Sequence, residues 1–215
     1  MDLLERLSAI PYSGALSDIL DEMGMRRQVL PHTIRAIEPG STVVGRALTV
    51  AGELAEGLRR DEYFLPYLHM LGSIQPGHVI VSQPNDLTVA HFGELSAETA
   101  KFRGGRGAVI DGGVRDLDYI ARLGFPVFAR YHTPQDIVGR WRLLDVNVTI
   151  AIGETRIAPG DYIVGDRDGV LVIPQAAAAD VVAKAEEVIH TENHVRRAIL
   201  EGVHPVDAYH RYGRF

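Results

Sequence analysis

The chain has 215 residues, a formal net charge of −6 and no cysteine; 46% of its residues are hydrophobic and 23% are charged. This length and composition are typical of one globular domain with a sizeable core, and the negative charge argues against a nucleic-acid binder, because such proteins need basic groups to neutralise phosphates. The lack of cysteine excludes disulfides and thiolate metal sites, and no apolar run is long enough to span a membrane, so we expect a cytoplasmic protein without a membrane partner.

Periodicity and turn residues predict helices and strands that alternate along the chain. Apolar residues three and four positions apart indicate helices, β-branched runs indicate strands, and Gly or Pro marks boundaries. The predicted elements are, in order, a helix at 16–23 capped by Gly24, a strand or bent strand pair at 41–51, a helix at 61–71, a strand at 78–82, a helix at 94–103, a strand at 108–110, a helix around 117–121, a strand at 126–129, strands within 147–152 and 162–174, and a helix at 175–202.

The centre of the chain determines the predicted fold class. A strand at 108–110, a helix and a strand at 126–129 form a β-α-β unit, which is the building block of parallel sheets. No repeat or Pro/Gly/Ser-rich linker divides the chain. We therefore predict a single α/β domain over 1–215, with 175–202 as a C-terminal helix.

One segment carries candidate functional groups. Ligands of open α/β sheets bind beyond the carboxyl ends of strands, and we interpret Asp111 to Gly113 as the turn at such an end. Arg115 then offers an anion clamp and Asp116 a metal ligand. Gly93 leaves the first amides of the following helix uncovered, which favours a substrate carboxylate there, with Glu94 on the same side. An ordinary turn followed by first-turn helix charges explains these residues equally well.

Several segments together resemble the RraA-like family. The resemblance is carried by Gly93-Glu94-Leu95-Ser96 and by the run from Val109 to Asp116, and it extends to 16–21, 45–50, 159–161 and 164–170. That family includes the class II pyruvate aldolases acting on 4-hydroxy-4-methyl-2-oxoglutarate or 4-carboxy-4-hydroxy-2-oxoadipate. It also includes RraA, a regulator that binds RNase E. The resemblance implies a swivelling β/β/α-type fold.

The resemblance also implies an activity and a role for each site residue. The activity is release of pyruvate from a 4-hydroxy-2-oxo acid by a divalent-metal-dependent lyase, with oxaloacetate decarboxylation as a side activity. Asp116 would be the protein ligand of Mg²⁺ or Mn²⁺, and Arg115 would bind the pyruvyl oxygens and stabilise the enolate. The amides of Leu95 and Ser96 would hold the substrate carboxylate, and Glu94 would orient a water on the metal for proton transfer.

Position 94 separates the enzymes of this family from its regulators. The aldolases have an acid, twenty intervening residues and then Arg-Asp, and Glu94 keeps that spacing to Arg115. The acid is usually Asp, so the longer Glu leaves the exact substrate open. The regulators typically have Gly at this position, so Glu94 favours an enzyme.

The resemblance further implies a homo-oligomer, a trimer or a hexamer. The aldolases receive another Glu from the C-terminal helix of a neighbouring subunit, and Glu192 is the candidate here. An ion pair between Glu192 and Arg196, which are four residues apart on a helix, is an equally supported alternative.

Two other functions stay open. One is a non-catalytic regulator of RNase E, and the other is a family enzyme that acts on a different oxo acid, since a fold does not determine a substrate. His91 lies close to the candidate site in sequence and could contact the substrate, but we favour its interpretation as a hydrogen-bonded structural histidine.

Overall fold

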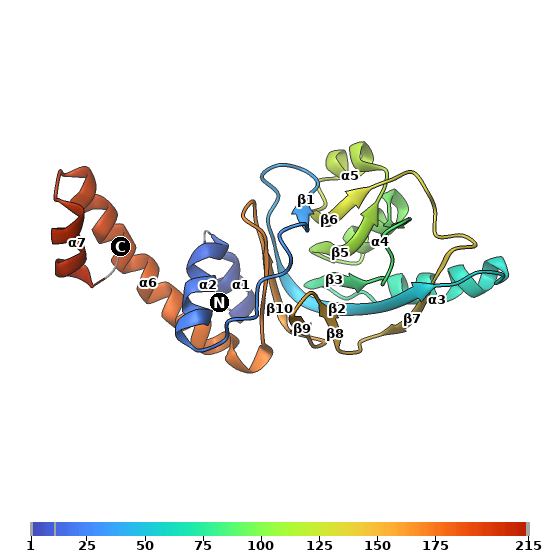
Figure 1. The fold of residues 1–215 in the computed structure, drawn as a ribbon, viewed down its shortest axis with the longest axis horizontal. Helices are drawn as coiled ribbons and strands as arrows, with labels where there is room; N and C mark the ends of the chain where they lie inside the picture. The colour runs from blue at the N-terminus through green and yellow to red at the C-terminus, as the bar shows by residue number, and fades with distance from the viewer. Residues whose placement is uncertain (1, 11, 214–215) are drawn as a thin grey trace.

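A nine-stranded mixed sheet runs through the computed structural model, which describes residues 2–10 and 12–213 (Figure 1). The elements in chain order are α1 (Leu3–Ser8), α2 (Ser13–Glu22), β1 (Arg35–Ala36), β2 (Val43–Leu54), α3 (Arg60–Gly72), β3 (His78–Gln83), β4 (Ala90–Phe92), α4 (Glu94–Phe102), β5 (Gly107–Val114), α5 (Leu117–Leu123), β6 (Val127–His132), β7 (Trp141–Val146), β8 (Ile150–Ile152), β9 (Thr155–Ile157), β10 (Tyr162–Gly165), β11 (Val170–Ile173), the 3₁₀ turn η1 (Gln175–Ala177), α6 (Ala178–Leu200) and α7 (Pro205–Tyr212).

The strands follow the order β1-β6-β5-β3-β2-β10-β11, with β4 added beside β5 and β7 beside β2. The pairs β2–β3, β3–β5, β4–β5 and β5–β6 are parallel, while β1, β7, β10 and β11 pair antiparallel. The sheet is nearly closed and barrel-like. The β-α-β unit predicted from the sequence is confirmed as β5-α5-β6, and the α/β class with it.

Helices α3, α4 and α5 lie together beside the parallel strands, toward the right and upper side of Figure 1. Their inward residues pack with strand residues in one buried cluster, which includes Met70, Leu71, Ala97, Ala100 and Ile120. Each of these helices connects two strands on the same side of the sheet, so their amino ends and the carboxyl ends of the strands meet at one edge. This arrangement is the edge at which ligands of α/β sheets bind.

A second helical group lies at the other side of the molecule. Helices α1 and α2 pack against β10, β11 and the first half of α6, and Arg6 of α1 forms an ion pair with Glu186 of α6 at 2.8 Å. The rest of α6 and α7 project away from the sheet (Figure 1). The C-terminal helix predicted at 175–202 is confirmed as η1 and α6. No described helix is long and apolar enough to cross a membrane.

One prediction about the central strand is wrong. Asp111 to Gly113 do not form a turn but continue β5. The glycines are there because neighbouring chain approaches closely: a Cβ on Gly112 would lie 2.6 Å from Nδ1 of His91, and one on Gly113 would lie 2.5 Å from the carbonyl oxygen of Val89. They therefore permit tight packing inside the sheet rather than the approach of a ligand.

Other differences are at element ends. The strand predicted from Asn147 begins only at Ile150, because Asn147 has a positive φ of 58° and turns the chain. The short helices α1 and α7 were not predicted, since six and eight residues carry little periodic signal.

Candidate functional site

A cleft of about 690 Å³ opens at the edge where the central strands end. One face of α3, strand β4, the first turns of α4, the residues just before α5 and the loop after β6 line it. The predicted site residues from Gly93 to Ser96 line this cleft together with Arg115 and Asp116. Residues separated by about twenty positions in the sequence are thus brought into one site.

Gly93 lies where the start of α4 meets the Arg115-Asp116 pair. It is the N-cap of α4 in an extended conformation, and the amide of Glu94 donates a hydrogen bond to Oδ2 of Asp116 at 3.1 Å. A Cβ on Gly93 would lie 2.7 Å from that same oxygen and 3.1 Å from Cγ of Arg115. Only glycine therefore lets the start of α4 approach the Arg115-Asp116 pair this closely.

The amide end of α4 is available to an anion. The first hydrogen bond of the helix runs from the amide of Ala97 to the carbonyl of Gly93 at 3.0 Å. The amides of Leu95 and Ser96 precede it, so they point out of the helix with the positive end of its dipole. Leu95 is 74% exposed, and its backbone amide is the polar group that it offers to the site.

Asp116 has an unusual backbone conformation. Its φ of 60° and ψ of 37° are left-handed, and it is the N-cap of α5. Non-glycine residues adopt this region at a cost, although Asp tolerates it better than most. Strained residues of this kind cluster at functional sites, and here the strain presents the Asp116 carboxylate to the cleft.

Arg115 lies between two carboxylates. Its Nη1 is 3.1 Å from Oδ2 of Asp136, and its Nε is 3.5 Å from Oδ2 of Asp116. Asp136, which lies in the loop after β6, was not predicted from the sequence. The place of Asp136 near the site could have been inferred, because β6 is parallel to β5 and its carboxyl end lies at the same edge of the sheet.

Tyr67 of α3 connects the walls of the cleft and was also missed. Its hydroxyl lies 3.0 Å from the carbonyl oxygen of His91 in β4, to which it donates, and 3.0 Å from Oγ of Ser96 in α4. Burial raises the pKa of Tyr67 to about 12, so the hydroxyl stays protonated. It fixes the distance between α3 and the amide end of α4.

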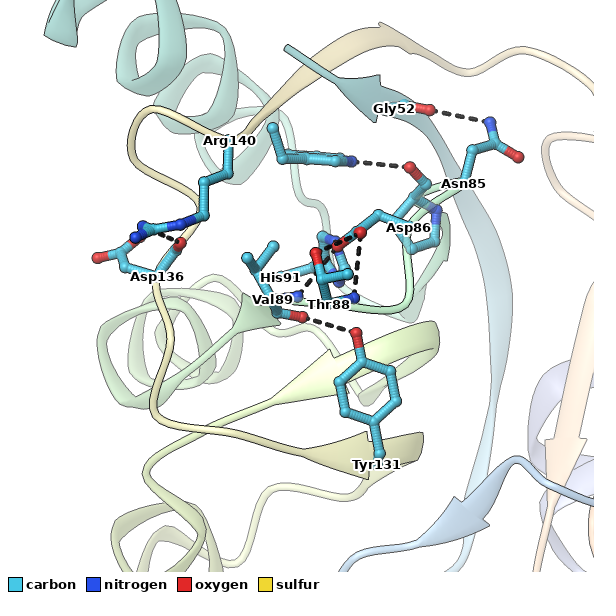
Figure 2. A network of polar contacts seen from close by, with 11 residues as sticks. Gly52, Asn85, Asp86, Thr88, Val89, His91, Tyr131, Asp136 and Arg140 are labelled. Carbon is cyan, nitrogen blue, oxygen red and sulfur yellow. Dashed lines mark hydrogen bonds and ion pairs between the residues drawn. The ribbon is translucent and has the colours of Figure 1, made fainter. Parts of the chain in front are cut away.

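Behind the cleft, the buried residues Asp86, Val89 and His91 and the exposed Thr88 form a set of polar contacts, here called the buried network (Figure 2), and the buried Trp141 packs against the ring of His91. The carboxylate of Asp86 accepts hydrogen bonds from the Thr88 amide at 3.0 Å, the Thr88 hydroxyl at 2.6 Å and the Val89 amide at 3.0 Å. Burial acts to raise the pKa of Asp86, but these hydrogen bonds outweigh it and the pKa is lowered. Asp86 therefore stays ionised in the interior.

His91 borders both the buried network and the cleft. Its ring is edge-on to Trp141 with centroids 5.2 Å apart, and its Nε2 lies 3.1 Å from Oδ2 of Asp86 in poor hydrogen-bonding alignment. Burial lowers its pKa to about 4, so the ring is neutral at physiological pH. The interpretation of His91 as structural is right about burial. It is wrong about hydrogen bonds, because neither ring nitrogen has an aligned partner among the described residues.

Glu192 is not part of this cleft within one chain. It lies on α6, on the side of the sheet away from α3 and α4 (Figure 1), and it accepts a hydrogen bond from the hydroxyl of Tyr12. The ion pair with Arg196 is not formed in the described structure, since Arg196 donates to Asn193 at 2.7 Å instead. A role for Glu192 at a neighbouring subunit's cleft stays a prediction.

The side-chain oxygen atoms that line the cleft indicate which kind of metal ion it could hold. Among the described residues no group of three or more His, Asp or Glu side chains is placed to surround an ion. The cleft instead presents carboxylates singly, from Glu94, Asp116 and Asp136. Mg²⁺ prefers hard oxygen ligands and usually keeps several waters, so one carboxylate such as Asp116 fits it, whereas a Zn²⁺-type cage does not.

Comparisons with known proteins agree on one family. The RraA-like family, described as Aldolase/RraA, matches residues 13–172. A protein of Halalkalibacterium halodurans named "Putative 4-hydroxy-4-methyl-2-oxoglutarate aldolase" is 35% identical over 210 residues, which cover 97% of this chain and 94% of that protein.

Two solved structures are similar over most of the chain. An uncharacterized protein from Pseudomonas syringae has a TM-score of 0.84 and 31% identity, with 96% of both chains covered. Streptomyces coelicolor RraAS2, described as an unusual member of the RNase ES inhibitor RraA protein family, has a TM-score of 0.79 and 28% identity, with 90% of this chain and 95% of that chain covered.

Proposed function

This chain belongs to the RraA-like family, and on that premise we propose that it is a divalent-metal-dependent lyase that releases pyruvate from a 4-hydroxy-2-oxo acid by retro-aldol cleavage. One observation carries the proposal. The amide end of α4, the Arg115 guanidinium and the Asp116 carboxylate converge in one cleft, where the Glu94 amide and Asp116 are 3.1 Å apart.

The proposed reaction breaks the bond between C3 and C4 of the substrate. The 4-hydroxyl loses its proton and C4 becomes a carbonyl, while the electron pair of the broken bond moves toward C2 and forms the enolate of pyruvate. C3 then takes up a proton. The enolate carries developing negative charge on the C2 oxygen, and that charge is what a catalyst must stabilise.

The residues of the cleft match these needs. The Leu95 and Ser96 amides would bind the substrate C1 carboxylate. Arg115 would place the positive charge of its guanidinium at the C2 oxygen. Glu94 would accept the 4-hydroxyl proton, directly or through water. No lysine lines the cleft among the described residues, so a Schiff base is not part of the proposal.

Asp116 would hold a Mg²⁺ or Mn²⁺ ion, with water and substrate completing its coordination. When bound, such an ion supplies Lewis-acid stabilisation of the oxygens of the 2-oxo acid. The same stabilisation of an enolate would allow decarboxylation of oxaloacetate as a side activity. We further propose a trimer or hexamer acting in the cytoplasm, in which Glu192 would complete the cleft of a neighbouring subunit.

The test is pyruvate release from 4-hydroxy-4-methyl-2-oxoglutarate and from oxaloacetate, each with Mg²⁺ or with EDTA. We expect release that requires the metal and falls at least 100-fold in Arg115→Ala, the order of effect seen when a group that stabilises an oxyanion is removed. Arg122→Ala is the matched control, because Arg122 lies on α5 over the ring of Tyr119 and outside the cleft. Release equal to that of the free metal ion would contradict the proposal.

The similarity to RraAS2 supports a second candidate, a regulator that binds an RNase E-type enzyme. Glu94 argues against it, because the regulators typically have Gly there. Co-sedimentation of this chain with such a nuclease, together with no pyruvate release, would favour the regulator.

A further inference from the structure

Arg60 is a second cationic residue in the cleft. It lies in the first turn of α3, and its Cζ is 5.2 Å from the centroid of the Phe64 ring. This contact with an aromatic face holds the charge against the cleft wall. No described carboxylate lies within 4.0 Å of its guanidinium, whereas its neighbour Arg59 pairs with Glu62 at 3.4 Å.

Helix stability does not explain Arg60. A cation in the first turn of a helix opposes the helix dipole. The start of α3 is already stabilised by the hydrogen bond from the Arg59 amide to the Glu62 carboxylate at 2.7 Å, in which Arg60 takes no part. The helix dipole therefore disfavours a cation here, and the contact with the Phe64 ring is the interaction of the Arg60 side chain among the described residues.

The distribution of charge along the cleft supplies one. Arg60 and Arg115 are the two Arg or Lys side chains among the described residues that line it. Arg115 is opposed by Asp136 at 3.1 Å and by Asp116 at 3.5 Å. Arg60 is opposed by neither, so it is the lining cation with a charge left for a ligand.

The wall between the two arginines is apolar. Tyr67 holds Ser96 at 3.0 Å, which places the middle of α3 beside the amide end of α4. Arg60 is seven residues earlier, about 10 Å along a helix axis, and Phe64 and Leu68 of the same helix also line the cleft. A ligand that matches this surface has an oxo-acid end, a carbon chain and a second anion.

Resting on the proposed function, we propose that Arg60 is a specificity-determining residue that binds a carboxylate at the far end of the oxo acid. Arg60 would then be the residue that accounts for a preference for dicarboxylic acids such as 4-hydroxy-4-methyl-2-oxoglutarate over monocarboxylic ones of the same length. Arginine suits this role because its planar guanidinium can bind a carboxylate through two parallel hydrogen bonds.

The first test compares 4-hydroxy-2-oxoglutarate with 4-hydroxy-2-oxopentanoate, in which a methyl group replaces the distal carboxylate. We expect Arg60→Gln to lower kcat/KM for the dicarboxylate about tenfold or more, and to change it less than about twofold for the monocarboxylate. Arg59→Gln is the matched control and should alter neither value. Equal losses for both substrates, or none for the dicarboxylate, would overturn the assignment.

A binding measurement separates this inference from the proposed function. Calorimetric titration with 2-oxoglutarate and 2-oxopentanoate in the presence of Mg²⁺ needs no turnover, and Arg60→Gln should weaken only 2-oxoglutarate. If wild type releases no pyruvate, the lyase proposal fails while this titration still decides on Arg60. Equal binding of the two acids by wild type, or a change of oligomer size in Arg60→Gln, would overturn the inference.

Discussion

In the cleft, the side chains of Arg115, Asp116 and Asp136 are each 37–38% exposed, whereas in the buried network the side chains of Asp86 and His91 are each 1% exposed. In each region, carboxylates lie close to a basic side chain, which is Arg115 in the cleft and His91 in the buried network. In the cleft water shares the stabilisation of each charge. In the buried network only the protein does, through the hydrogen bonds that Asp86 accepts from Thr88 and Val89.

Because of this difference, the two regions control different properties of the protein. When a partly hydrated charge is removed, few hydrogen-bonding groups lose their partners, so the free energy of folding changes little. The main loss is then the interaction with the ligand. Removing a buried charge leaves its donors without partners, and folding bears the cost. The cleft should therefore respond to substitution in activity, and the buried network in stability.

The largest expected effect is on stability, from Asp86→Ala. The change removes the acceptor of the buried Val89 amide and of the Thr88 amide and hydroxyl, so we expect the free energy of unfolding to fall by about 4 kcal/mol. Chemical denaturation followed by circular dichroism measures it. Asp145→Ala is the control, because Asp145 is exposed and accepts only from the Val146 amide, and it should cost below about 0.5 kcal/mol. Similar losses in both variants would remove the contrast between the regions.

A pH dependence should follow from His91, whose pKa is lowered to about 4 in the folded state. Between this value and about 6.5, the unfolded chain binds a proton that the folded protein does not, so stability is complete above about pH 6.5 and falls by about 3 kcal/mol toward pH 4. Asp86, the charged group facing the ring, keeps its lowered pKa below this window.

The difference between wild type and His91→Gln isolates this contribution. His78, with a lowered pKa, and Asp111, with a raised pKa, affect both proteins alike. Unfolding free energies at pH 4.5, 5.5, 6.5 and 7.5 should show a flatter curve for His91→Gln, while the exposed control His69→Gln should follow wild type. Parallel curves for wild type and His91→Gln would contradict the assignment.

The next effect is on activity, from Gly93→Ala. The added Cβ would lie 2.7 Å from Oδ2 of Asp116, so Asp116 and Arg115 must shift. A displacement of this size at a reacting centre costs about 100-fold in rate, or about 2.7 kcal/mol at 1.36 kcal/mol per factor of ten. Pyruvate release measures it.

Gly72→Ala is the matched control for that change, since nothing lies within 4 Å of the position of its Cβ. It should leave pyruvate release unchanged. A loss of activity in Gly93→Ala that is fully accounted for by unfolding would count against the close approach as a functional requirement.

The smallest effect tests Tyr67, which lines the cleft and contacts the backbone of His91 in the buried network. Tyr67→Phe removes the hydroxyl that contacts the His91 carbonyl and Ser96, each at 3.0 Å. We expect a loss of about 1 kcal/mol in stability, typical of one hydrogen bond, with a parallel decrease in pyruvate release. Tyr119→Phe, on the exposed surface of α5, should change neither quantity. Loss of stability without any change in rate would show that Tyr67 supports the fold and not the reaction.

Much of the fold was predictable, because its central elements have strong local signals. The apolar run that became β5 and the helical spacing that became α4 are visible in the sequence alone. The approach of Glu94 to Asp116 also followed from chain order, since both lie at the same end of the sheet. Asp111 to Gly113 were misread because glycine serves both turns and close packing, and only the position of His91 separates the two.

The missed residues depend on tertiary structure. Tyr67 contacts Ser96 across 29 residues of sequence, and Asp136 contacts Arg115 across 21. Neither has a neighbouring motif that marks it. Arg60 is missed for the same reason, since its role as a lining residue follows from how α3 is placed against α4.

Trp141 has one further consequence. It is the only tryptophan in the chain, it is 1% exposed, and its indole N–H donates to the carbonyl of Pro84 at 2.8 Å. A Cβ on Gly52 would overlap its ring, so glycine at the irregular position of the β2–β7 pairing lets β2 pack directly against the indole. The tryptophan fluorescence of the protein therefore arises from one position beside His91, and with selective excitation of the indole it gives a label-free optical signal from the interior directly behind the cleft.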